Sequence, residues 1–246
     1  GNYGAISNRD WLPVGVDEYG YVAPDPLNSD IVYGGRNVTR FDRRTGQVSS
    51  VGPAGGRGGG GAPTPGPVRT VRTMPVVFSE VDKVSLFFAN NYLWKTMDGG
   101  AHWSQISPDL TRPTWETPRS VGEYLGDEAA KPHPRGVIYT IAPSYQDIRR
   151  IWVGTDDGLI HVTADGGHTW KDVTPKAVGP WAKVSIIDAG RFDPLTAYAA
   201  VNTLRLDDMR PHIFRTHDGG ATWTEIVAGI PHGETVNAVR EDPKKK

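Results

Sequence analysis

The sequence predicts an all-β protein, a β-propeller made of four-stranded antiparallel blades. Three observations lead to this prediction. The first is the composition: 30 Gly, 20 Pro and 8 Trp in 246 residues indicate many turns and large aromatic side chains, which is typical of short strands joined by hairpins. The second is a motif that occurs three times. The third is a strand–turn–strand element that is repeated along the chain.

The repeated motif reads Thr-x-Asp-Gly-Gly-x-x-Trp and occurs at Thr96–Trp103, Thr163–Trp170 and Thr216–Trp223. An Asp in a turn can accept hydrogen bonds from main-chain amides about two residues ahead, and the Gly pair supplies positive φ angles without steric cost. The Trp can then pack between neighbouring sheets and bury roughly 150–250 Å². We therefore assign structural roles to three residues of each motif: Asp98, Gly100 and Trp103; Asp165, Gly167 and Trp170; Asp218, Gly220 and Trp223.

In the third observation, a short strand leads through a Pro- or Asp-containing turn into a second strand that ends in small residues, as in Val22–Pro26 followed by Ile31–Gly35. Small residues suit the crowded centre of a radial array. Counting these elements predicts one propeller domain over 1–246, with blades at 20–51, 74–107, 136–174 and 182–228. The first blade carries a Thr45-Gly46 hairpin in place of the motif.

Two flanking segments extend the same pattern. Residues 8–14 read as the last strand of a preceding blade, and residues 236–243 read as the first strand of a following blade. The chain is therefore expected to be part of a larger propeller, or to belong to a ring that partner chains complete. A five-bladed ring closed by the two ends is an alternative, but it would leave one blade short of strands.

The charge and the residue types exclude several function classes. The chain has 27 Lys and Arg against 28 Asp and Glu, so it has no overall positive field for nucleic acid. Cys is absent, which excludes disulfides and thiolate metal sites, and the seven His residues lack the spacing of a zinc site. We therefore expect neither a metal nor a cofactor. No apolar run approaches the ~20 residues that span a bilayer, so no transmembrane segment is expected.

Alternating antiparallel strands place the three Asp-Gly-Gly motifs at one face and the long connections at the other. The long connections carry acids, an aromatic residue and an arginine that could bind a ligand: Trp115, Glu123, Asp127, Asp156, Asp157, Asp207, Asp208 and Arg210. Carboxylates beside aromatic rings can bind or cleave sugars, and paired acids can raise each other's pKa or hold Ca²⁺. Solvated loops, and ordinary turn chemistry at Asp157-Gly158, are the alternative interpretation.

The three motifs resemble the Asp-box (BNR) repeats of sialidases, xyloglucanases and sortilin-type propellers. Longer stretches, among them Ile106–Thr111, Gly154–Val162 and Val239–Pro243, resemble large secreted bacterial proteins of the sortilin-like or "glycosyl hydrolase" group. This resemblance implies a longer protein and a location outside the cytoplasm. It transfers no catalytic residue, because the arginine cluster, Tyr-Glu pair and acid Asp of a sialidase have no assignable counterparts here.

The sequence therefore predicts a non-catalytic module that binds a protein or a glycan through its loop face, as an extrinsic subunit of a larger assembly would. The alternative is a glycoside hydrolase that draws its acid and base from six carboxylates, namely Glu123, Asp127, Asp156, Asp157, Asp207 and Asp208.

Overall fold

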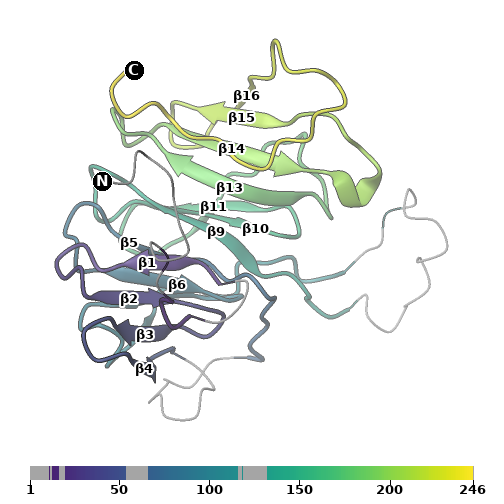
Figure 1. Cartoon of the computed structure of the whole chain (residues 1–246). Coiled ribbons are helices and arrows are strands. Elements are labelled where there is room, and N and C mark those ends of the chain that lie inside the picture. The colour runs from purple at the N-terminus through teal and green to yellow at the C-terminus, as the bar shows by residue number, and fades with distance from the viewer. Residues whose placement is uncertain are drawn as a thin grey trace.

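The computed structural model describes residues 11, 13–16, 20–53, 66–115, 118 and 132–245. These residues form four antiparallel sheets of four strands each, and consecutive strands pair within every sheet (Figure 1). The strands, in chain order, are β1 (Val22–Pro24), β2 (Ile31–Gly34), β3 (Thr39–Asp42) and β4 (Gln47–Ser50); β5 (Val76–Phe78), β6 (Leu86–Ala89), β7 (Leu93–Thr96) and β8 (Ser104–Gln105); β9 (Ile138–Pro143), β10 (Ile151–Thr155), β11 (Ile160–Thr163) and β12 (Lys171–Asp172); and β13 (Lys183–Ala189), β14 (Ala197–Asn202), β15 (Ile213–Thr216) and β16 (Thr224–Glu225). A 3-10 helix, η3 (Leu204–Leu206), follows β14.

The second strand of each sheet is the most deeply buried. Strands β2, β6 and β10 are buried along their whole length, and β14 is buried at all but one position. Such strands read as continuous apolar runs because neighbouring sheets cover both of their faces. The fourth strand of each sheet is short and largely exposed.

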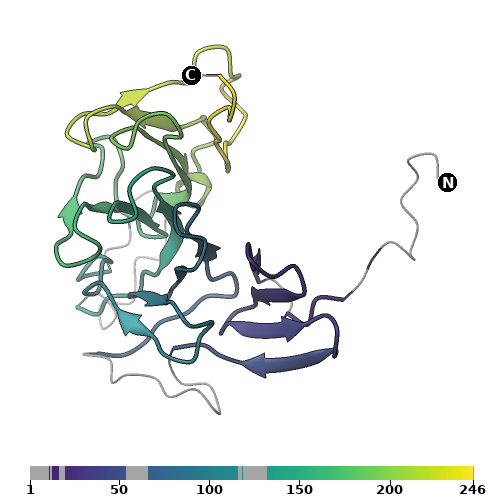
Figure 2. The ribbon, with the colours of Figure 1, turned by 90° about the vertical axis from the view of Figure 1, so that its left-hand side faces the viewer.

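The sheets follow one another around a common centre, from β1–β4 to β13–β16 (Figure 2). Three apolar clusters fill the spaces between successive sheets. Trp94 lies between the first two sheets, Phe87 with Ile151 between the second and third, and Trp152 with Val184 between the third and fourth. The core is therefore divided into layers between sheets, as in a propeller.

The Asp-Gly-Gly turns share their Thr–Asp and main-chain hydrogen bonds in all three copies. In the first, the Thr96 hydroxyl donates to Asp98 Oδ1 at 2.8 Å and accepts from the amide of Gly100 at 3.0 Å. Asp98 Oδ1 also accepts from the amide of His102 at 2.9 Å. The sequence predicted a bonded amide about two residues ahead of the Asp. The bonded amide lies four residues ahead instead, because the Thr hydroxyl accepts from the nearer amides of Asp98 and Gly100.

Each motif Trp joins its sheet to the preceding sheet. The indole Nε1 of Trp103, Trp170 and Trp223 donates to the main-chain oxygen of Val51 (2.6 Å), Ile106 (2.8 Å) and Val173 (2.7 Å), respectively. These acceptors directly follow β4, β8 and β12, the outermost strands of the preceding sheets. The second Gly of each motif packs against the same residues. The tryptophans are buried or half-buried at these contacts.

The two flanking segments remain predictions as partial blades. Most of 8–14 lies outside the described residues. Residues 236–243 form no strand in the described part of the chain, but they lie along the fourth sheet. There, the amide of Glu241 donates to Asp188 at 2.8 Å, and the Glu241 carboxylate accepts from Tyr198 at 3.1 Å.

Within the described residues, no helix is long and apolar enough to traverse a lipid bilayer.

Candidate functional site

The connections between strands separate into two faces. The Asp-Gly-Gly turns lie beside the turns that join the first and second strands, since Gly166 and Gly219 donate to the main-chain oxygens of Arg149 and Leu195 at 2.9 Å. The other connections lie at the opposite ends of the strands and form the loop face, which comprises the described residues of 35–38, 51–53, 66–75, 90–92, 106–115, 118, 132–137, 156–159, 173–182 and 203–212.

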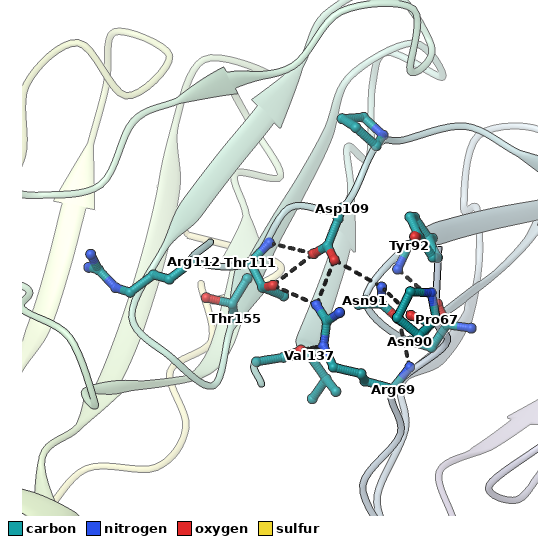
Figure 3. Close-up of polar contacts among 12 residues, drawn as sticks. Pro67, Arg69, Asn90, Asn91, Tyr92, Asp109, Thr111, Arg112, Val137 and Thr155 are labelled. Carbon is teal, nitrogen blue, oxygen red and sulfur yellow. Dashed lines mark hydrogen bonds and ion pairs between the residues drawn. The ribbon is translucent and has the colours of Figure 1, made fainter. Parts of the chain in front are cut away.

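A hydrogen-bonded network around Arg69 joins several loops of this face (Figure 3). The Arg69 guanidinium donates to Asp109 Oδ2 at 2.6 Å, to the Thr111 hydroxyl at 2.7 Å and to the main-chain oxygen of Gly136 at 3.0 Å. Asn91 donates to Asp109 at 3.1 Å. Although burial alone would raise the pKa of Asp109, the hydrogen bonds from Thr111 and Arg69 lower it, so the carboxylate is charged and fixed.

The network continues through the chain into Arg112, whose side chain points away from Asp109 (Figure 3). The amide of Arg112 donates to Asp157 Oδ2 at 2.9 Å, and its guanidinium donates to the main-chain oxygens of Asp157 at 2.7 Å and Gly158 at 3.2 Å. Asp157 is only 1% exposed and accepts a further bond from Thr155 at 2.5 Å. Both of its carboxylate oxygens therefore serve to hold the loop.

A pocket of about 210 Å³ opens beside this contact. Its walls come from the loops after β8, β10 and β12, and its lining residues are Arg112, Thr114, Trp115, Asp157, Pro180 and Trp181. The rings of Trp115 and Trp181 lie 4.6 Å apart between centroids, with an interplanar angle of 39°. The pocket thus combines two tryptophans with one arginine. These are among the residue types that contribute most of the binding energy at protein interfaces.

Trp181 has two unusual features. Its φ angle of +67° lies in the left-handed region, which costs a bulky residue roughly 1–3 kcal/mol and is concentrated at ligand-binding sites. Its indole Nε1 is buried, and no group among the described residues accepts a hydrogen bond from it. Both features cost stability, so they indicate that the position of Trp181 serves a role other than stabilising its own loop.

Two basic side chains, those of Lys183 and Arg205, lie near Asp156 in the loop 156–159, which follows β10. Asp156 accepts a hydrogen bond from the amide of Val137 at 2.8 Å, and burial raises the pKa of its carboxyl. The Arg205 guanidinium donates to the main-chain oxygen of Asp156. Lys183 lies over the ring of Tyr139, with its Nζ 4.7 Å from the centroid. Burial, followed by the charge of Arg205, lowers the pKa of Lys183.

The residues predicted from the sequence fall into three groups. Trp115 and Asp157 line the pocket, and Asp156 adjoins it. Asp208 and Arg210 form a separate exposed ion pair at 2.8 Å, next to Asp207 with its φ of +58°. Glu123 and Asp127 lie outside the described residues.

Sequence reasoning missed the basic residues Arg112, Lys183 and Arg205 and the aromatic Trp181. Trp181 could have been found from the sequence. A tryptophan in the long connection 174–183 lies outside the expected strands, so it is not needed to fill the space between sheets. The basic residues carry no such signal, since each belongs to a different connection or strand. In the described part of the chain, no three His, Asp or Glu residues are grouped closely enough to hold a metal ion.

No protein-family model matches the chain, and no curated protein matches it. Among solved structures, it is similar to an ancestral GH74 enzyme, with 14% identity and a TM-score of 0.61, over 91% of this chain and 27% of that one. It is also similar to the Dos1 propeller, with 12% identity and a TM-score of 0.49, over 82% and 47% of the two chains. A third similarity is to YCF48 bound to D1 peptide, with 20% identity and a TM-score of 0.40, over 66% and 40%.

At these identities the similarities concern the fold alone. The four sheets and the similarity to the GH74 enzyme confirm the predicted class, an all-β chain of β-propeller blades. The chain spans about a quarter of the length of that enzyme, 27%.

Proposed function

We propose that this chain is a non-catalytic binding module that captures a protein or a glycan through its loop face. The observation that carries the proposal is the pocket of Trp115, Trp181 and Arg112. Its walls are fixed by the bonds of Arg112 to Asp157 and Gly158 and by the adjoining Arg69 network. A fixed aromatic pocket loses little conformational entropy when a ligand binds.

The state of the carboxylates supports binding rather than catalysis. General acid–base chemistry needs a carboxyl group that can reach the substrate. Asp157 is buried and uses both oxygens within the loop, and Asp208 is paired with Arg210. Two of the six carboxylates that the alternative of a glycoside hydrolase would draw on, Asp157 and Asp208, are therefore engaged in contacts within the chain. A binding module of this kind would suit an extrinsic subunit of an assembly outside the cytoplasm.

The test is an array of peptides and oligosaccharides probed with the wild-type chain and with Trp115→Ala. The wild type should bind a discrete set of features, and Trp115→Ala should lose them, because half of the aromatic lining is removed. Arg149→Ala is the control, since the Arg149 side chain is 70% exposed and its main-chain oxygen accepts from an Asp-Gly-Gly turn on the opposite face. Equal binding by Trp115→Ala, or release of reducing sugar from the oligosaccharides, would contradict the proposal.

A further inference from the structure

In each of the first three sheets, one residue directly after the outermost strand receives the sheet that follows. The main-chain oxygens of these residues accept from the motif indoles: Val51 from Trp103, Ile106 from Trp170 and Val173 from Trp223. The same residues contact the second glycine of the motif that reaches them. One residue of each sheet thus forms the point at which the next sheet is attached.

The fourth sheet has the same kind of residue. Ile226 directly follows β16, as Val173 directly follows β12. The Ile226 amide donates to the main-chain oxygen of Ile213 at 2.8 Å, and the Val173 amide donates to that of Ile160 at 2.9 Å. In the part of the chain that the structure describes, no group donates to the main-chain oxygen of Ile226. Ile226 is therefore built into its sheet like the three acceptors but receives no tryptophan.

The face of the fourth sheet beside Ile226 also resembles a face that is already covered. Trp152 is the second residue of β10, and Tyr198 is the second residue of β14. Trp152 is 0% exposed and lies edge-on to Trp223 of the next sheet, with ring centroids 6.1 Å apart. Ala197 and Ala199 belong to the cluster between the third and fourth sheets, so Tyr198 faces the other way. Tyr198 is half-buried, and part of its surface is open to a similar aromatic contact.

Residues 237–241 follow the first two strands of this face. The Glu241 amide donates to Asp188 of β13 at 2.8 Å, and the Glu241 carboxylate accepts from Tyr198 of β14 at 3.1 Å. Among the described residues, no hydrogen bond from 237–241 reaches β15, β16 or Ile226. The last two strands are therefore the part of the face that a motif tryptophan would occupy.

We infer that the fourth sheet is a docking surface for a further four-stranded sheet that carries the Thr-x-Asp-Gly-Gly-x-x-Trp motif, and that its tryptophan donates to the main-chain oxygen of Ile226. The further sheet belongs to the same polypeptide, because all three observed contacts join consecutive sheets of one chain, across 52, 64 and 50 residues. This surface lies outside the loop face and does not depend on the proposed binding function.

A second copy of this chain fits the surface less well. Its three motif tryptophans already donate to acceptors within the chain. Its first sheet carries a Thr45-Gly46 hairpin in place of the motif, so that sheet has no motif tryptophan to offer.

Thiol labelling tests the surface, because the chain has no Cys of its own. Ile226→Cys places a thiol at the open position, and Val173→Cys places one at the covered equivalent, where the valine is 5% exposed. A maleimide should label Ile226→Cys at least about tenfold faster than Val173→Cys, because the reaction requires an accessible thiolate. Equally slow labelling would mean that Ile226 is already covered and would overturn the inference. Circular dichroism checks that the variants are folded.

A longer chain supplies the further sheet. In it, a second copy of residues 182–246 follows Glu234, so that the copied Trp223 lies 50 residues after Ile226, the separation that Trp223 has from Val173. Ile226→Cys should be labelled at least about tenfold more slowly in this chain, because the added sheet covers the thiol and local opening becomes rarer. Trp223→Ala in the added copy should restore fast labelling.

Three outcomes would overturn the inference. Labelling of Ile226→Cys that is equally fast in the longer chain, whether or not the added sheet folds, would show that the fourth sheet does not accept another sheet. Slow labelling that persists with Trp223→Ala in the added copy would show that the indole is not the attachment. Labelling of the original chain that slows as its concentration rises would identify a second copy as the occupant. Array binding by Trp115→Ala is a separate measurement, so this inference and the binding function can fail independently.

Discussion

At the residue scale, the second glycine of each Asp-Gly-Gly turn has two separate requirements. Gly100, Gly167 and Gly220 have φ angles of +93°, +103° and +88°, which favour glycine. A Cβ atom at Gly167 would also lie 2.4 Å from the main-chain oxygen of Ile106, the residue that receives the Trp170 indole. The first glycine, Gly166, has a φ of +77°, but among the described residues no atom lies within 4 Å of the position that a Cβ would take. In this turn, Gly166 is required only for its backbone conformation. Gly167 is required both for its conformation and for its close contact with the preceding sheet.

Ala substitutions at Gly166 and Gly167 should separate these two requirements. Gly166→Ala should cost about 1–2 kcal/mol of unfolding free energy, the penalty of a left-handed residue. Gly167→Ala should cost at least about twice as much, because main chain of the preceding sheet must also move. Urea unfolding of the two variants gives the comparison, and equal losses would show that the sheet contact has no energetic weight.

At the element scale, each Asp-Gly-Gly turn depends on an ionised carboxylate. The hydroxyl of Thr222 is the main cause that lowers the pKa of Asp218 to about 2 from 3.8, followed by the Thr222 amide and the Thr216 hydroxyl. The pKa values of Asp98 and Asp165 are lowered still further, chiefly by the His102 amide and the Thr169 hydroxyl. Because the folded value lies below the unfolded one, this stabilisation is present above about pH 4 and is lost as the pH falls toward about 2.

Asp218→Asn tests this dependence. The wild type should lose stability between about pH 4 and pH 2, and the variant should lose less over the same interval, because one depressed carboxylate has been removed. Urea midpoints at several pH values provide the measurement, with Asp25→Asn as a control for an Asp in a different kind of turn. A variant with the wild-type pH slope would mean that other groups govern acid unfolding.

At the scale of the whole molecule, the Arg69 network ties together the connections that follow the first and second sheets. Arg69 and Asp109 have side-chain exposures of 16% and 29%, so their ion pair is largely removed from water. Replacing one partner leaves the other charged and partly buried, which costs more than replacing both.

A double-mutant cycle of Arg69→Met and Asp109→Asn should reveal this pairing. Each single variant should lose about 1–3 kcal/mol of unfolding free energy, and the double variant should lose less than the sum. Chemical denaturation of the four proteins supplies the cycle. Additive losses would show that Arg69 and Asp109 stabilise the loop face independently.

The sequence was informative wherever the signal is local. The apolar runs of β2, β6 and β10 and the Asp-Gly-Gly turns are contained within a few residues, so the sheets and their order could be predicted. The acceptor of each motif indole could not, because it is a main-chain oxygen in another sheet, which any residue type provides. Of the pocket residues, Trp115 and Asp157 were predicted, but their meeting with Arg112 and Trp181 was not, because these four residues come from three connections that only the fold brings together.

The bonds from Trp103, Trp170 and Trp223 all run backward along the chain, across 52, 64 and 50 residues and without exception toward an earlier sheet. During synthesis, the outermost strand of a completed sheet therefore lacks its tryptophan contact until the next motif has been translated. At about 5–20 residues per second, this interval is about 3 to 13 s. A nascent chain of this kind therefore completes its sheets from the N-terminus toward the C-terminus. At each stage, the outermost strand of the newest sheet is the one that still lacks its tryptophan contact.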